Sequence, residues 1–120
     1  MSSVAGAVPG VPGVACYSAT KAYEKVLAHS MGRELEKYGV GVTCLLPGAV
    51  KGTEFASRSN LEKALAFRIP FYAMKAPDVA SRAVRAMLSG DAEVIPGWHN
   101  RVFLKVLSPI LPQRLTASIA

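Results

Sequence analysis

Apolar residues recur at the spacing of an α-helix over residues 16–38, and this pattern predicts a long amphipathic helix. Gly39 suits its C-terminal cap. Two further helices are predicted, over 54–67 and over 77–89, the latter with Pro77 and Asp78 in its first turn. The expected apolar face of the first helix consists of Tyr23, Val26, Leu27, Met31 and Leu35. That of the third helix consists of Val79, Ala83, Val84, Met87 and Leu88.

An apolar run predicts a buried parallel strand over 40–46, ended by Pro47, and a short strand is predicted over 93–95. Glycines and prolines make residues 1–15 a loop. Two parallel strands cannot form a stable sheet alone, because their edges and faces need partners. We therefore expect an α/β fold that is the back part of a doubly wound parallel sheet, with a further strand ahead of Met1.

Composition narrows the function classes. The net charge of +6 comes from basic residues that are scattered and not interleaved with aromatic ones, which argues against nucleic-acid binding. Cys16 and Cys44 stand apart from any histidine cluster, so they predict neither a disulfide framework nor a metal site. They favour a reducing compartment, and a cytoplasmic location is the expectation.

The segment Cys16-Tyr17-Ser18-Ala19-Thr20-Lys21 carries the main candidate chemistry. A tyrosine and a lysine four residues apart lie on one face of a helix. A free phenol titrates near pH 10, and a nearby ammonium favours the phenolate, which brings the group toward use as a general acid or base. The alternative interpretation of the spacing is a buried aromatic residue beside a surface lysine.

The surrounding motifs point to one family. Ser2-Ser3-Val4-Ala5-Gly6 precedes Tyr17, and Pro47-Gly48-Ala49-Val50 follows the predicted strand, with Thr53 shortly after. In this order the motifs resemble the short-chain dehydrogenase/reductase family, from Ser2 to about Thr53. The resemblance implies that residues 1–120 are the C-terminal part of a Rossmann-like catalytic domain, mostly helical as it stands. No G-x-x-x-G-x-G turn for a pyrophosphate occurs, so we expect a fragment or truncated product that is inactive alone.

The resemblance also assigns roles. Ser3 would orient the substrate oxygen, with Ser2 as the competing choice, Tyr17 would be the general acid/base, and Lys21 would assist it and bind the nicotinamide ribose. Pro47, Gly48, Val50 and Thr53 would line the nicotinamide, so the implied cofactor is NAD or NADP. The loop before Tyr17 and the gap from Val50 to Thr53 are each one residue longer than the common family pattern. Thr53 also suits a helix N-cap.

Two other functions stay open. The chain could be an inactive homologue that serves as a binding or dimerisation module. Ser18-x-x-Lys21 also fits the nucleophile motif of serine acyl enzymes such as β-lactamases, but Lys51-Gly52-Thr53 has the wrong order for the partner K-T-G motif.

Partners are less sharply indicated. The variable region favours an apolar alcohol or carbonyl substrate through Phe55, Leu61, Leu65, Phe71 and Met74. Homo-oligomerisation is expected for the full-length protein by resemblance. The apolar tail, Val102 to Ile119, is interrupted by Pro109 and Pro112. We expect a lid or a subunit-packing helix there, and a segment in a membrane interface, hence membrane association, is the alternative.

Overall fold

The computed structural model describes residues 1–8, 10–58 and 73–119. Its centre is a layer of parallel backbone. Strand β1 (Cys44–Leu45) pairs with β4 (Glu93–Val94), Cys44 standing opposite Glu93. On the other edge of β1, the Ser2 and Val4 N–H groups donate to Leu45 O and Pro47 O, at 2.9 and 3.0 Å. The segment from Ser2 to Val4 therefore runs parallel to β1 and forms a third member of the layer, as the predicted doubly wound fold requires.

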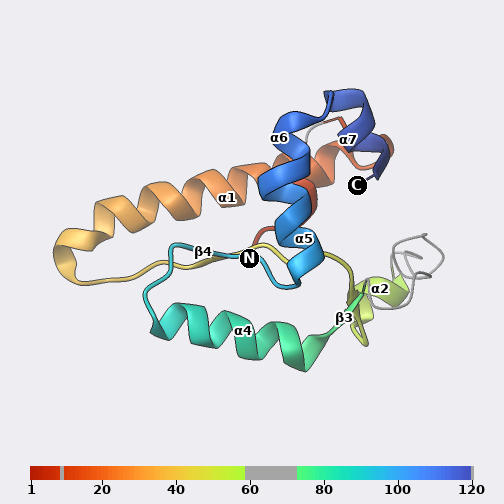
Figure 1. Cartoon of the computed structure of the whole chain (residues 1–120). Coiled ribbons are helices and arrows are strands. Elements are labelled where there is room, and N and C mark those ends of the chain that lie inside the picture. Colours follow the sequence, from red (N-terminus) through yellow and green to blue (C-terminus); the bar gives the residue numbers. More distant parts are fainter. Residues whose placement is uncertain (9, 59–72, 120) are drawn as a thin grey trace.

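Two long helices cover opposite faces of this layer, α1 (Ala15–Leu35) above it and α4 (Ala76–Leu88) below it in Figure 1. A 3₁₀ turn, Glu36–Tyr38, extends α1, and Gly39 ends it at a left-handed φ of 72°. Pro77 and Asp78 occupy the first turn of α4. Both predicted helices are confirmed to within a residue or so, and a parallel α/β fold with helices on both faces is confirmed with them.

A second pair of parallel strands continues from the end of β1. Strand β2 (Val50–Lys51) pairs with β3 (Met74–Lys75), with Val50 opposite Met74. Helix α2 (Glu54–Arg58) follows β2. It confirms the beginning of the helix predicted over 54–67. The rest of that prediction lies outside the described residues, as do Leu61, Leu65 and Phe71 of the expected apolar substrate surface. The sequence pattern did not predict this second pair, whose strands are two residues each.

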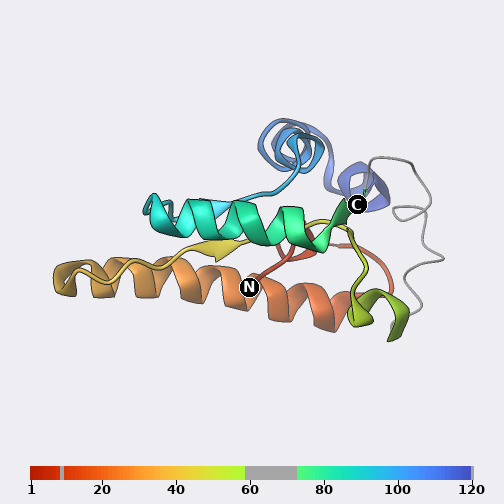
Figure 2. The same cartoon turned by 90° about the horizontal axis from the view of Figure 1, so that it is seen from below.

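The tail after β4 is helical. Helix α5 (Trp98–Val102) continues through a π-helical turn, Phe103–Leu107, into α6 (Ser108–Ile110), and α7 (Gln113–Ile119) follows. In Figure 2 the continuous helix of residues 98–110 is seen nearly end-on, on the side of β4 away from α1. Phe103 packs on Val4 and Val8. Across residues 1–58 and 73–119, apart from position 9, no helix is long and apolar enough to cross a membrane.

Two local predictions need correction, and a third is confirmed. The strand predicted over 40–46 is ordered as a strand only at Cys44–Leu45, because its partner β4 is equally short. The loop predicted over 1–15 contains a 3₁₀ turn, Val4–Gly6, that Ser3 caps by accepting a hydrogen bond from the Ala5 N–H. The strand predicted over 93–95 is confirmed at Glu93–Val94.

The predicted apolar faces of the helices are the larger correction. On α1, Tyr23, Val26, Leu27 and Met31 are exposed, and α1 has no fully buried residue. On α4, Val84, Met87 and Leu88 are exposed, whereas Val79 and Ala86 are buried. Periodicity shows which residues share a face but not what covers it. Among the described residues, only the faces of α1 and α4 that lie against the strand layer are covered by other parts of the chain.

Candidate active site

The serine segment is held between α1 and the end of β1. The buried Ser2 hydroxyl donates to Lys21 O at 2.6 Å, so it serves the junction with α1. The Ser3 hydroxyl accepts from the Ala5 N–H at 3.2 Å and lies 3.5 Å from Pro47 O, a long and weak contact. Of the two serines, Ser3 therefore has the hydroxyl that a substrate could more easily engage.

Gly6 explains why a glycine follows the two serines. A Cβ at this position would lie 2.6 Å from the Lys21 carbonyl carbon, 2.7 Å from Lys21 Cβ and 2.8 Å from Ala22 N. Only glycine lets the 3₁₀ turn approach the backbone of α1 this closely. The contact sets the serine segment against the turn of α1 that carries Lys21.

Tyr17 and Lys21 lie one turn apart on α1, as predicted. The Lys21 Nζ is 5.8 Å from the centroid of the Tyr17 ring, within the range of a cation–π contact. The Tyr17 ring stacks on Phe55 of α2 with centroids 6.0 Å apart and planes inclined by 26°. Phe55, which the sequence suggested only as part of an apolar substrate surface, thus covers one side of the phenol.

The ammonium of Lys21 has a partner that sequence reasoning missed. It donates to both carboxylate oxygens of Glu24 at 3.0 Å and to Met1 O at 3.1 Å. The i, i+3 spacing of Lys21 and Glu24 on the predicted helix was a signal that could have identified the pair. The three N–H donors of the Lys21 ammonium are thus taken up by Glu24 and Met1, so a further acceptor would have to displace one of these contacts.

The predicted nicotinamide wall lies at the carboxyl end of β1, the edge where ligands bind in open parallel sheets. Pro47 is buried and its carbonyl accepts from the Val4 N–H at 3.0 Å. Val50 begins β2, and Thr53 directly precedes α2. Ser3, Tyr17, Lys21 and Pro47 therefore belong to one connected neighbourhood, and their roles remain predictions.

Gly48 is shaped by a residue that the sequence did not single out. A Cβ at position 48 would lie 2.6 Å from Asn100 Nδ2 and 2.7 Å from Asn100 Oδ1. Asn100 is buried, and its amide donates to Pro96 O at 2.9 Å. The Pro96-Gly97 dipeptide before it was the available signal, because it marks a turn at which β4 ends and a new element begins. Asn100 thereby links α5 to the Pro47-Gly48 segment after β1.

An ionic cluster joins α1 to β4 away from this site. The Glu93 Oε2 lies 3.0 Å from His29 Nε2 and 3.1 Å from Lys25 Nζ. Burial acts to raise the pKa of Glu93, but the hydrogen bonds and charges of His29 and Lys25 outweigh it and lower the pKa. Burial, reinforced by the charge of Glu93, raises the pKa of the Cys44 thiol, so this cysteine stays neutral as a core residue. No group of three potential metal ligands gathers within the described part of the chain.

Comparison with known proteins establishes the family. Residues 1–64 match the family model for short chain dehydrogenases, and the chain belongs to that family. It is 35% identical over 115 residues to a protein named as an uncharacterized oxidoreductase from Myxococcus xanthus (strain DK1622), with 96% of this chain and 42% of that protein covered. It is 29% identical over 110 residues to a very-long-chain 3-oxoacyl-CoA reductase-like protein from Arabidopsis thaliana, with 90% and 33% covered.

The chain thus spans less than half the length of each of these curated relatives. No solved structure matches it. The relatives' names are those of oxidoreductases, in agreement with the family assignment.

The family's usual cofactor, NAD(P), can be tested against the residues present. A phenol, an ammonium, a serine hydroxyl and the backbone that follows Pro47 are donors and acceptors suited to a nicotinamide and its ribose. They meet at one edge of the strand layer, so they fit that end of the dinucleotide. The sequence has no glycine-rich turn for the pyrophosphate, so the fit extends to the nicotinamide end alone.

Proposed function

We propose that the chain is the catalytic part of an NAD(P)-dependent oxidoreductase that interconverts an alcohol and a carbonyl. The observation that carries the proposal is the contact of the serine segment with the Lys21 turn of α1. Gly6 seats Ser3 beside the helix that presents Tyr17 and Lys21, and Ser2 bonds to the backbone of Lys21. Three residue types that suit proton transfer at a substrate oxygen are thereby held on two adjoining backbone segments.

In this proposal each residue has a stated task. The bound nicotinamide would supply hydride acceptance or donation. The Tyr17 hydroxyl gives a proton to the substrate oxygen in reduction and takes one in oxidation. The Ser3 hydroxyl donates to the same oxygen and orients it. Lys21 leaves Glu24, favours the phenolate by its charge and donates to the ribose hydroxyls. Pro47, Gly48, Val50 and Thr53 line the nicotinamide.

The proposed substrate is apolar around its reacting carbon. Phe55 stacks on Tyr17, so an apolar ring stands beside the phenol that would act on the substrate. The name of the Arabidopsis thaliana relative, a very-long-chain 3-oxoacyl-CoA reductase-like protein, refers to a substrate with a long apolar chain. Both observations favour an apolar carbonyl or alcohol over a sugar.

The test uses Tyr17→Phe in a chain that carries a preceding cofactor-binding half, grafted from the Myxococcus xanthus relative. Turnover should fall by a factor on the order of 10² or more, while nicotinamide binding persists. Tyr23→Phe is the matched control, because Tyr23 lies on the same helix and is exposed. Near-normal turnover in Tyr17→Phe, or an equal loss in Tyr23→Phe, would refute the assignment.

Lys21→Met in the same protein should lower both turnover and cofactor affinity, because the ammonium serves the phenol and the ribose. Lys37→Met, at an exposed lysine at the far end of α1, is its control. The 120-residue chain alone should show no saturable micromolar binding of NADH or NADPH by fluorescence titration, since the glycine-rich turn would be missing. Such binding to a folded monomer would contradict this part of the proposal.

A second candidate function is favoured by one observation. The apolar residues Tyr23, Val26 and Leu27 of α1 are exposed, which suits a module that binds a partner or dimerises. Sedimentation of the chain with and without Val26→Asp tests it, since a contact module should lose self-association. The serine acyl enzyme gains no such support. The Ser18 hydroxyl has no hydrogen-bond partner among the described residues, and Glu24 holds Lys21.

A further inference from the structure

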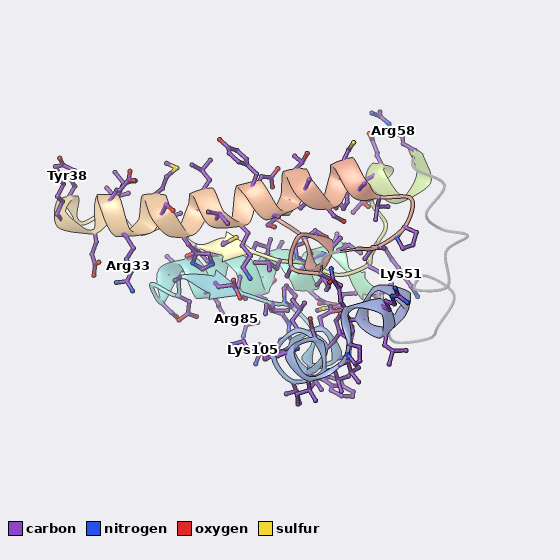
Figure 3. All side chains as sticks on the ribbon, turned by 90° about the horizontal axis from the view of Figure 1, so that it is seen from above. Arg33, Tyr38, Lys51, Arg58, Arg85 and Lys105 are labelled. Carbon is purple, nitrogen blue, oxygen red and sulfur yellow. The ribbon has the colours of Figure 1, made fainter. Side chains whose placement is uncertain are left out.

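The helix formed by residues 98–110 has two different sides. Its inner side carries the buried Asn100 and Phe103. Its outer side carries Trp98, Val102, Val106 and Ile110, spaced four apart and exposed to 77%, 42%, 49% and 75%. Figure 3 looks nearly down the axis of this helix, which lies at the edge of the molecule, and shows that many of its side chains project away from α1 and α4, whereas Lys105 points sideways. Residues four apart form one stripe along a helix.

Two basic residues lie beside the apolar stripe, on the flank of the helix next to β4. Arg101 and Lys105 are exposed, they alternate with the apolar stripe, and neither forms an ion pair with a described residue. The sequence from position 94 to position 120 contains no aspartate or glutamate. The acidic residues that precede this stretch in the sequence are Asp91 and Glu93. They line a shallow hollow together with Arg101 and Lys105. The charge of Glu93 is already balanced by Lys25 and His29.

We propose that the outer side of helix 98–110, defined by Trp98, Arg101, Val102, Lys105, Val106 and Ile110 and here called the tail face, binds the surface of an anionic lipid bilayer. A helix of this length, about 20 Å, can lie flat in the headgroup region with its apolar stripe inserted. Tryptophan is suited to the boundary between acyl chains and headgroups. The cations beside the stripe then meet lipid phosphates and carboxylates, as in other interfacial helices.

Charge selects this occupant over a second copy of the chain. Two tail faces related by a twofold axis would bring Arg101 and Lys105 toward their own copies. The carboxylates that border their hollow are those of Asp91 and Glu93, and Glu93 is already paired with Lys25 and His29, so the cations of the two copies would outnumber the carboxylates left to offset them. An anionic bilayer offers the opposite charge and an apolar interior in one surface. The proposal does not depend on the catalytic assignment, since none of its residues belongs to the candidate active site.

The chain carries its own probe for this contact, because Trp98 is its one tryptophan. The full chain is mixed with vesicles of phosphatidylcholine and phosphatidylserine in a 7:3 ratio, or of phosphatidylcholine alone, and binding is read by flotation. We expect flotation and a shift of Trp98 emission to shorter wavelength with the mixed vesicles. Both signals should weaken in 0.5 M NaCl, because salt screens the charges. Absence of any dependence on phosphatidylserine would overturn the proposal.

Two substitutions locate the contact on the tail face. Lys105→Gln should lower the vesicle partition coefficient about fivefold, and Val106→Asp should lower it at least tenfold. Val84→Asp, at an exposed valine of α4, and Lys37→Gln are matched controls that should leave it unchanged. Circular dichroism confirms that each variant keeps its helices. Equal losses in the controls, or a Trp98 shift that follows protein concentration without vesicles, would overturn the proposal in favour of another surface or a second copy.

Discussion

Gly6 and Phe103 both hold the segment from Ser2 to Val8 in place, but they do so by opposite means. Gly6 acts through the side chain it lacks, since its backbone lies against Lys21 where a Cβ would be 2.6 Å from the carbonyl carbon. Phe103 acts through its ring, which fills the space over Val4 and Val8 from the C-terminal helix. The serine segment is therefore fixed from one side by backbone approach and from the other by side-chain packing.

This difference explains why the segment with Gly6 can be recognised from a sequence motif, whereas the C-terminal helix with Phe103 cannot. Close backbone approach requires a glycine at one position, so it leaves a spaced motif. Packing of an aromatic ring can be met by several apolar residues of similar volume, so it leaves only an apolar tail. The family model accordingly covers residues 1–64, and Phe103 lies beyond it.

The largest expected effect comes from removing the ring. Phe103→Ala should lower the free energy of unfolding by about 3–5 kcal/mol, because it leaves a cavity over Val4 and Val8. Trp98→Ala, an equally drastic truncation of an exposed aromatic residue on the same helix, should cost far less. Urea denaturation of the chain followed by circular dichroism gives both values. Similar costs for the two variants would mean that the tail does not hold the serine segment.

Gly6→Ala tests the other side of the comparison. The added methyl would meet backbone atoms of Lys21 and Ala22 that cannot rotate away, so we expect a loss of about 1–3 kcal/mol. Gly41→Ala is the matched control, since nothing lies within 4 Å of a Cβ at that position. It should be neutral or slightly stabilising. In the same urea experiment, a tolerated Gly6→Ala would show that the approach to α1 is loose.

A double-mutant cycle at Gly48 and Asn100 probes a contact that combines a close backbone approach at a glycine with the packing of a buried side chain. Gly48→Ala should cost about 1–2 kcal/mol alone, because its Cβ would meet the buried Asn100 amide. In the Asn100→Ala background the atoms nearest that Cβ are gone, so the same substitution should cost much less. Unfolding free energies of the four proteins give the coupling. Additive costs would show that Asn100 does not set the need for glycine at position 48.

Local signals account for what the sequence could predict. The α1 helix with its Gly39 cap, the α4 helix with its Pro77 start and the end of β1 ahead of Pro47 each depend on neighbours in the chain, and each is confirmed. The ion pair between Glu24 and Lys21 also joins residues close in sequence, but charge pairs on a helix are too common for one of them to be identified as functional from the sequence. What failed depends on distant residues. The exposure of the α1 stripe and the contact of Asn100 with Gly48 are set by elements far away in sequence.

The C-terminal helix illustrates the same limit. Pro109 suggested an interruption, yet it lies in the first turn of α6, directly after the π-helical turn Phe103–Leu107. There the Ser108 N–H bonds to Phe103 O, so the register of hydrogen bonds shifts before the proline is reached. A π turn has no sequence signature of its own, and proline is tolerated at the start of a helix. The tail could therefore be recognised as apolar but not assigned as a continuous helix.

The smallest expected effect concerns the ionic cluster that ties α1 to β4, and pH separates it from packing. Glu93 accepts from Lys25 and His29, and its side chain retains 22% of its exposure, so we expect Glu93→Gln to cost only about 1 kcal/mol at pH 7. Because folding lowers the pKa of Glu93 below its ordinary value of 4.5, its charge stabilises the fold above that value. This stabilisation is lost as the pH falls through the lowered pKa. The difference in unfolding free energy between the wild-type chain and Glu93→Gln should therefore shrink toward zero in acid, whereas the deficit of Phe103→Ala should persist.

Glu34→Gln, at an exposed glutamate of α1, is the control and should show little effect at either pH. Urea denaturation at pH 7 and in acid measures all three, and a Glu93→Gln deficit that survived in acid would assign Glu93 to packing instead of charge.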